Sequence, residues 1–363
     1  MELNHNEKAM IVLSSGMNIG TKKADEILKI VGGAEYFYEN IRKKQSQIRE
    51  ILSEKIYRQL CENADNIDFK KLEKTLKEKN IIVLTKDDER YPESLKGYDS
   101  SPLCLYCIGN IRLLNIPSFA VIGSRYPTHY GIRVTEKFVS KLCDRFCIVS
   151  GMARGIDAYS HKVALECGGR TIAVLGSGVD VIYPPENRYL YKRITEEGLV
   201  ISQFMPGTKA MPYHFPIRNE VISGLSRAVL ITEAGEQSGT RLTRNYAIKQ
   251  GKEIFCVPGN IFNKSSAGCN KAIMDCQTRM VLDVNDIYYE LGMPKSEETT
   301  QTNKIRLDVN ESKIVNILTA KGELHFEEIL DCVELSVPQL TTLLTKMTAL
   351  GIITKTKHNY WSI

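Results

Sequence analysis

Three short glycine-bearing segments carry polar side chains that could bind an anion: Gly123-Ser124-Arg125, residues 150–157 and residues 176–180. Glycine lets backbone N–H groups approach an anion closely, and a helix beginning at such a turn adds partial positive charge. Arg125 and Arg154 lie inside the turns, which would place their guanidinium groups against a phosphate. A single turn of this kind is more often a tight strand-to-helix connection. Tight packing does not require arginine, so the combination predicts a phosphate-binding site.

Each turn follows a short apolar run that is typical of a buried strand, at residues 119–122, 147–149 and 171–175. A helical pattern follows the first two turns, with Phe138, Leu142 and Phe146 at helical spacing in one case and residues 158–166 in the other. Strand, turn and helix in this repeated order predict an α/β fold with a parallel sheet. Ligands bind at the carboxyl ends of such strands, so we expect the three turns to cluster there.

The composition limits the class of protein. The chain has 363 residues, 43% of them hydrophobic and 25% charged, with a net charge of +5. These values fit a protein of two or three domains, and the charge is compatible with nucleic acid without arguing for it. No apolar run has the length of a membrane span, the N-terminus is too polar for a secretion signal, and the ten cysteines fit a reducing compartment. We therefore expect a cytoplasmic protein that does not engage a membrane.

Metal and cofactor sites are not indicated by the motifs. The six histidines lie far apart, and no P-loop, zinc-protease or nucleophile-elbow motif occurs. Cys104 and Cys107 form a Cys-x-x-Cys, but a strand-like context and the lack of a second pair favour structural cysteines over zinc or redox chemistry.

Composition and periodicity divide the chain into four parts. Residues 1–75 are helical, 76–290 alternate strand and helix, 291–309 form a polar linker, and 310–363 form a small terminal unit. Within the first part, residues 13–24 resemble a helix-hairpin-helix, whose turn can hold a DNA phosphate; a plain helix–turn–helix packing unit is the alternative.

The terminal unit has the pattern of a winged helix, with three helical segments followed by a hairpin. It contains five lysines against six carboxylates, a net charge of −1, and its third helical segment has only Lys346. A DNA-reading helix is usually basic, so we interpret this unit as a protein–protein or regulatory module.

Seven ordered motifs between Gly123 and Asn270 resemble those of the DNA-processing protein A (DprA, Smf) family. Besides the three turns, with Tyr183-Pro184 and Asn187 after the third, the motifs are Phe215-Pro216-Ile217-Arg218-Asn219 with residues 222–226, Ser238-Gly239-Thr240, residues 257–260 and Gly268-Cys269-Asn270. The resemblance implies an extended Rossmann-like core, a helical N-terminal domain like a SAM or helix-hairpin-helix domain, and a C-terminal winged-helix domain. It also implies a homodimer that binds single-stranded DNA and loads the RecA recombinase in natural transformation and recombination, with neither enzymatic activity nor a cofactor.

The resemblance also assigns roles to single residues. Arg125 would grip a phosphate, Phe215 would stack on a base, and Arg154 and Arg218 would line or brace the same pocket. This agrees with the physics of sequence-tolerant binding, which needs a basic groove and an aromatic face. Phe215 could instead only fill the core. The remaining residues implied in DNA binding are Gly123, Ser124, Ser150, Gly151, Ala153, Gly155, Gly176, Gly178, Lys209, Asn219, Ser238, Gly239 and Thr240.

The chain departs from the family pattern at several positions. Glu220 stands where a second arginine is frequent, and Pro212 replaces a lysine for which Lys209 could compensate. Thr243-Arg244 and Cys276-Gln277 also replace the usual residues. These departures bear on the strength of DNA binding.

Two other functions are open at this stage. A nucleotide-binding enzyme resembling the LOG-type phosphoribohydrolases could use Asp157 and Glu233 as paired carboxylates. The structural alternative is that Asp157 caps backbone N–H groups and Glu233 binds loop amides. A DNA-free adaptor would be favoured if the pocket arginines were buried in internal ion pairs.

Overall fold

A computed structural model describes residues 2–15, 19–295, 308–349, 352–356 and 359–362. The chain divides into two compact units, Met1–Ser296 and Glu297–Ile363. Most of the expected linker lies outside the described residues, as does the centre of the expected hairpin turn at residues 16–18.

One sheet organises the first unit, in the strand order β1-β2-β6-β5-β4-β3-β7-β8-β9. The seven strands from β6 to β9 are parallel, which confirms the predicted parallel sheet. At one edge β2 pairs antiparallel with β6, and β1 antiparallel with β2. The bounds are β1 Ile82–Thr85, β2 Cys104–Gly109, β3 Ser118–Ile122, β4 Cys147–Ser150, β5 Thr171–Val174, β6 Leu199–Ser202, β7 Ala228–Ile231, β8 Glu253–Cys256 and β9 Arg279–Met280.

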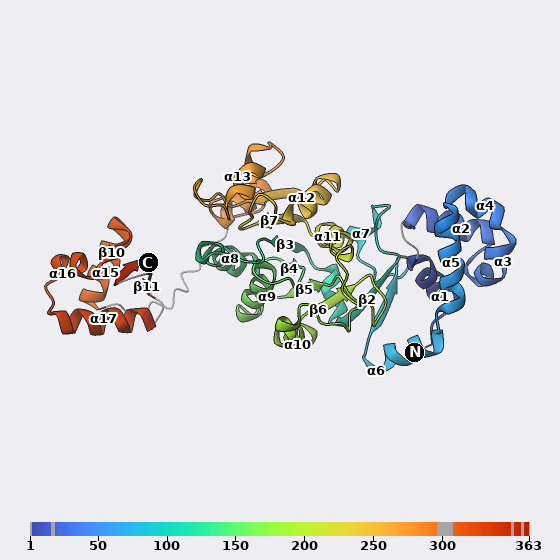
Figure 1. Ribbon diagram of the computed structural model, residues 1–363, viewed down its shortest axis with the longest axis horizontal. Helices are drawn as coiled ribbons and strands as arrows, with labels where there is room; N and C mark the ends of the chain where they lie inside the picture. The colour runs from blue at the N-terminus through green and yellow to red at the C-terminus, as the bar shows by residue number, and fades with distance from the viewer. Residues whose placement is uncertain (1, 16–18, 296–307, 350–351, 357–358, 363) are drawn as a thin grey trace. The chain divides into compact units, whose positions relative to one another are not determined.

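Helices cover both faces of this sheet (Figure 1). Phe119 and Val121 of β3 pack with α8, α9 and α14, whereas the alternate residues Ala120 and Ile122 share a cluster with α7, α11, α12 and α13. Strand β3 is thus buried on both sides, which explains its unbroken apolar run. The helices are α7 Glu93–Lys96, α8 His129–Leu142, α9 Ile156–Glu166, α10 Arg188–Glu197, α11 His214–Leu225, α12 Thr240–Lys249, α13 Ala267–Met274 and α14 Val284–Glu290, with short 3₁₀ turns η2 Ile111–Asn115 and η3 Pro185–Asn187.

Phe146 corrects one detail of the predicted helix. Helix α8 ends at Leu142, so Phe146 follows the helix and leads directly into β4. Its ring packs on Phe119 with a centroid distance of 5.3 Å. The helical spacing was therefore coincidental, because a buried residue beside a strand satisfies the same apolar pattern.

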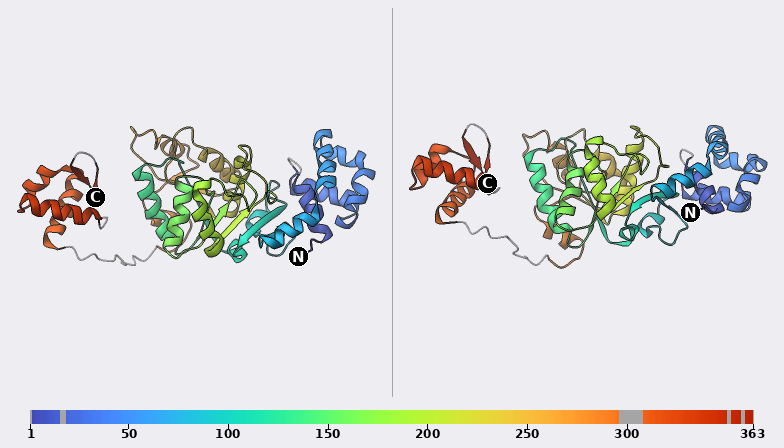
Figure 2. Two further views of the ribbon diagram at one scale, coloured as in Figure 1. Left: turned by 60° about the horizontal axis from the view of Figure 1, so that its bottom comes forward. Right: turned by 90° about the horizontal axis from the view of Figure 1, so that it is seen from below.

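The N-terminal helices pack beside the β1–β2 end of the sheet (Figures 1 and 2). Ile11 and Leu60 belong to the same buried cluster as Val83, Tyr106 and Val200 of the sheet. This continuous cluster explains why residues on both sides of the expected boundary at 75 and 76 lie in one compact unit. The elements are α1 His5–Ser14, α2 Thr21–Val31, η1 Ala34–Tyr36, α3 Phe37–Lys43, α4 Gln45–Ile51, α5 Glu54–Asn66 and α6 Phe69–Glu78.

Cys104 and Cys107 lie on opposite faces of β2, one in the cluster with the N-terminal helices and the other in the cluster beneath α11. Both are free and buried, and burial raises the pKa of each thiol to about 12. Residues three apart on a strand cannot share a ligand, which confirms structural cysteines.

The second unit contains the three expected helices and the terminal hairpin. Helix α15 Val309–Lys321 is followed by β10 Leu324–His325, α16 Phe326–Cys332, α17 Val337–Ala349, β11 Thr354–Lys355 and β12 Tyr360–Ser362. The strands form a small sheet in the order β10-β12-β11. Ile314, Leu344 and Trp361 share its core. The winged-helix assignment of this unit stays a prediction.

Within the described part of the chain, none of the helices combines the length and the apolar character that a membrane crossing requires.

Candidate nucleic-acid interface

The three glycine turns follow the adjacent strands β3, β4 and β5 at their carboxyl ends, as expected. The first two touch, because the Ile156 N–H donates to the Ser124 carbonyl over 3.0 Å. Gly155 lies in this contact with φ +78°, and a side chain there would collide with the Ser124 carbonyl. Glycine is therefore required by both backbone angle and space.

Arg125 is exposed at the end of the first turn. Its guanidinium carbon lies 5.9 Å from the centre of the Phe215 ring, within the range of a cation–π contact. The cation and the aromatic ring that the sequence placed 90 positions apart therefore meet at one site.

Phe215 lies in the first turn of α11 and is half-buried. Its ring rests against Gly176, since a Cβ at Gly176 would be 2.8 Å from the ring atom Cδ1. Tyr183 lies beside the ring with a centroid distance of 5.5 Å and an interplanar angle of 35°. The ring is thus packed on one side while part of it reaches solvent, so packing and base stacking are compatible roles for Phe215.

Arg218 lies beneath this ring and is only 4% exposed. Its Nη1 donates to the Val174 carbonyl over 2.7 Å and to the Gly151 carbonyl, and its guanidinium carbon lies 5.8 Å from the Phe215 ring centre. Burial lowers the pKa of Arg218 to about 10, with the Asp157 carboxylate opposing that change. Of the two expected roles, lining or bracing, this geometry favours bracing: the side chain ties β4 to β5 and does not face solvent for a phosphate.

Asp157 is buried beside Arg218 and accepts a hydrogen bond from the Gly151 N–H over 3.2 Å. Burial raises the pKa of Asp157, and the charge of Arg218 acts against this rise. Glu233, 1% exposed, accepts from the Thr128 N–H over 2.8 Å and from the Thr128 hydroxyl. The expected structural roles of both carboxylates, binding backbone N–H groups, are confirmed.

Arg154 is exposed and forms an ion pair with Glu186 of η3. Hydrogen bonds to Glu186 and then to Tyr126 raise the pKa of Arg154. Because such surface pairs contribute little free energy, Arg154 can exchange Glu186 for a phosphate.

Lys209 is exposed on the loop between β6 and α11. The loop is held against the third turn, because the Gly178 N–H donates to the Thr208 carbonyl over 2.8 Å and the Gly207 N–H to Asp180 Oδ1 over 2.7 Å. Pro212 is exposed on the same loop. Lys209 directly follows Thr208, so its backbone lies beside the third turn.

The remaining expected residues differ in how they contribute. Ser150 donates its hydroxyl to the Val121 carbonyl over 2.6 Å, and Asn219 accepts from Arg218, so both serve the framework. Ser238, Gly239 and Thr240 lead into α12 after β7. No hydrogen bond or ion pair between described residues joins this segment to Arg125 or Phe215. Gly178 lies against the backbone of residues 205–208, Gly123 lies against the Ile156 side chain and the Glu233 carbonyl, and Ala153 is half-buried.

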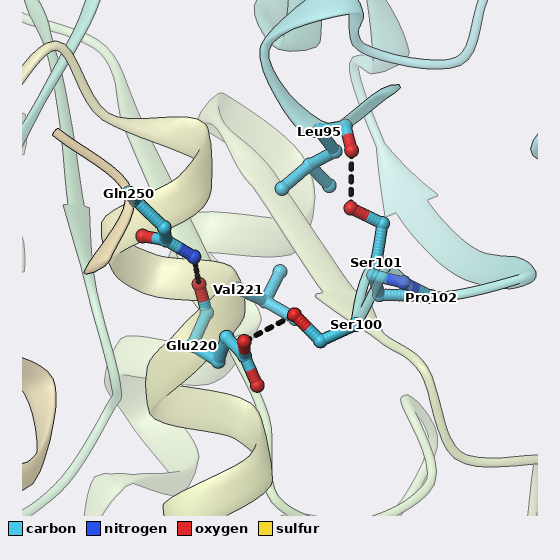
Figure 3. Close-up of a pocket in the computed structure, with 7 residues that line it drawn as sticks. All are labelled: Leu95, Ser100, Ser101, Pro102, Glu220, Val221 and Gln250. Atoms are coloured by element: carbon cyan, nitrogen blue, oxygen red, sulfur yellow. Dashed lines mark hydrogen bonds between the residues drawn. The ribbon is translucent and has the colours of Figure 1, made fainter. Parts of the chain in front are cut away.

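Glu220 faces away from Phe215, since five residues along a helix correspond to about 140° of rotation. Its carboxylate accepts a hydrogen bond from the Ser100 hydroxyl, at a depression with no room for a water molecule (Figure 3). Gln250 donates to the Glu220 backbone carbonyl over 3.1 Å in the same place. The negative charge of Glu220 is thus committed to a contact between α11 and the 97–102 segment.

Three exposed tyrosines lie beside motif residues; Tyr183 belongs to the motif series but was given no role from the sequence, and Tyr126 and Tyr213 were not singled out. Tyr126, Tyr183 and Tyr213 are 77%, 47% and 55% exposed, next to Arg125, Phe215 and His214 respectively. For Tyr126 and Tyr213, the available signal was an aromatic residue close in sequence to Arg125 and Phe215. Tyr183 packs against Phe215, Tyr213 packs against His214, and Tyr126 hydrogen-bonds Arg154.

A model of the family described as DNA recombination-mediator protein A matches residues 82–292. Protein Smf of Synechocystis is 40% identical over 63% of this chain and 58% of its own length, so the match spans little more than half of that relative. DNA processing protein DprA of Streptococcus pneumoniae is 39% identical over 56% of this chain and 72% of its own length.

Two solved structures are also similar. The X-ray structure of DNA processing protein A from Streptococcus pneumoniae has a TM-score of 0.65 at 31% identity, covering 80% of this chain and 99% of that one. A Helicobacter pylori DNA processing protein A structure, whose title describes a unique single-stranded-DNA-binding mode, has a TM-score of 0.53 at 28% identity and covers 58% and 95%.

Proposed function

This chain belongs to the DNA recombination-mediator protein A family, and from that premise we propose that it binds single-stranded DNA at the Arg125–Phe215 site. One observation carries the proposal: an exposed guanidinium and a half-exposed aromatic ring meet above glycine turns. A cation for the backbone and a π-face for a base are the two elements of sequence-tolerant single-strand binding.

Within this proposal, each residue has a distinct role. Arg125, Arg154 and Lys209 neutralise phosphates, and Phe215, flanked by Tyr183, stacks on a base. Arg218 braces the pocket floor from below. The glycines of the three turns keep the backbone close enough for N–H groups to assist.

The proposed biological role is to promote loading of the RecA recombinase on incoming strands, in DNA uptake, natural transformation and recombination in the cytoplasm. The proposed active form is a homodimer through the Rossmann-like core. Large apolar side chains are exposed on α12, α13 and the loop before α13. They support a dimer contact on this side of the core, since exposed apolar patches mark interaction sites. These side chains are Leu242, Ile261, Phe262 and Met274.

A nucleotide-hydrolysing enzyme is a weaker candidate for this fold. Paired catalytic carboxylates must reach a substrate. Asp157 and Glu233 are instead buried and bonded to backbone N–H groups. An adaptor that does not bind DNA is also weaker, because only Arg218 of the pocket arginines is buried.

The replacement Arg125→Ala tests the proposal. We expect affinity for a single-stranded oligonucleotide to fall by about ten- to a hundred-fold, since a charge-assisted hydrogen bond contributes roughly 1.5–3 kcal/mol. The matched control is Arg170→Ala. Arg170 is also exposed, but it lies at the amino end of β5, whereas the glycine turns lie at the carboxyl ends of the strands. Unchanged affinity of a folded Arg125→Ala protein, or an equal loss in the control, would remove Arg125 from the site.

A further inference from the structure

Helix α6 carries an unusual density of exposed lysines. Its apolar residues Phe69, Leu72 and Leu76 pack against the cluster that also contains Leu175 and Val179, next to the third glycine turn. The lysines occupy the opposite side of the helix, and all are exposed: Lys70, Lys71, Lys74 and Lys77, with Lys79 just after the helix.

Few of these positive charges are neutralised. Lys74 approaches Glu78 at 3.8 Å, and Lys79 pairs with Asp180. Glu73 is turned away, accepting from the Leu3 N–H and pairing with Lys8. Among the described residues, Lys70, Lys71 and Lys77 have no acidic partner. Repulsion among unpaired lysines destabilises the folded protein unless a bound polyanion neutralises them or water and salt screen their charges.

The position of this stripe favours the polyanion. Lys79 Nζ lies 2.6 Å from Asp180 of the third turn, and Asp180 also accepts from the Gly207 N–H, on the loop that carries Lys209. The loop then continues into α11 and Phe215. Figures 1 and 2 show α6 between the N-terminal helices and the sheet. Through Asp180, the third turn therefore joins the C-terminal end of α6 to the loop that carries Lys209.

We propose that α6 is a second contact segment for single-stranded DNA, in which Lys70, Lys71 and Lys77 neutralise backbone phosphates of a strand that leaves the Phe215 site. This inference rests on the proposed function and lengthens the segment of DNA that the protein contacts. The ten-residue helix adds about 15 Å of basic surface, which only a strand longer than the Phe215 pocket can reach. The contacts are electrostatic and carry no base preference.

The test compares oligothymidylates of about 6 and about 30 nucleotides, bracketing the usual site sizes of sequence-tolerant binders. The variant is the triple replacement Lys70→Gln, Lys71→Gln and Lys77→Gln in the full chain. The control is Lys43→Gln, Lys44→Gln and Lys55→Gln, three exposed lysines of the N-terminal helices without acidic partners among the described residues. Each lost phosphate contact lowers the log–log salt slope by about 0.7 on a single strand.

We expect the α6 variant to bind the long strand about ten- to a hundred-fold more weakly, with a slope smaller by about 2, and to bind the short strand as the unchanged protein does. The control should leave both strands unaffected. The inference is overturned if the α6 variant binds the long strand with the affinity and salt slope of the unchanged protein, or if the control loses as much affinity as the α6 variant. Binding of the short strand by the unchanged protein would still support the Phe215 site in either case. If the unchanged protein binds neither strand, the proposed function fails as well.

Discussion

At the scale of single residues, the central question is how one ring serves both packing and recognition. Phe215 rests on Gly176, and two guanidinium carbons lie within 6 Å of its ring centre, that of exposed Arg125 at 5.9 Å and that of buried Arg218 at 5.8 Å. The two arginines are chemically identical but differ in solvent access, and this difference separates binding from support. Motif resemblance alone cannot make that distinction, since both arginines occur in motifs.

Phe215 yields a prediction that separates stacking from packing. Phe215→Leu retains apolar volume against Gly176 but removes the π-face, so we expect single-strand affinity to fall by about 1–3 kcal/mol per stacked base with a small change in melting temperature. Phe215→Trp should retain binding. The salt slope should not change, because the ring neutralises no phosphate. Tyr189→Ala is the control, as Tyr189 is 77% exposed on α10. A Phe215→Leu protein that binds normally would restrict Phe215 to packing.

Arg218 yields the opposite pattern. Arg218→Ala deprives the Val174 and Gly151 carbonyls of their donor and leaves Asp157 without its nearby cation. We expect a loss of roughly 3 kcal/mol in the free energy of unfolding, as measured by urea denaturation. The salt slope of the folded variant should match that of the unchanged protein. A stable variant with a smaller slope would instead make Arg218 a phosphate ligand.

At the scale of elements, the predictable part of the fold was the part with local signals. Apolar runs ending in glycine turns located β3, β4 and β5, because strands buried on both faces need unbroken apolar sequence. The antiparallel edge formed by β1 and β2 was not predicted. Between them lies only α7, a four-residue helix, so no crossover pattern marked the change of direction.

The site divides in the same way. Arg125 and the turns were accessible from residue type and spacing, and the resemblance supplied Phe215. The side on which Glu220 faces and the burial of Arg218 depend on how α11 is rotated against the sheet. Tertiary packing, rather than local sequence pattern, sets how a helix is rotated. The direction of Glu220 and the burial of Arg218 could therefore not be predicted from the sequence.

At the scale of the whole molecule, the two compact units imply separable roles. The second unit has a net charge of −1 in the sequence from residue 310 onward, whereas the exposed cations of the proposed site and α6 lie in the first. We expect a protein that lacks residue 304 and all that follow to keep the melting temperature of the first unit. Its oligonucleotide affinity should stay within a few-fold of that of the full chain. A large affinity loss in a folded truncated protein would reveal a DNA contact in the second unit.

The central claim is single-strand binding through a few exposed cations and one aromatic ring. The most direct measurement is the affinity of the full chain for matched single-stranded and duplex oligonucleotides across a salt series. We predict a strong single-strand preference and, for a short strand held by Arg125, Arg154 and Lys209, a log–log slope of about −2. Equal or tighter duplex binding, or affinity that does not change with salt, would contradict the account.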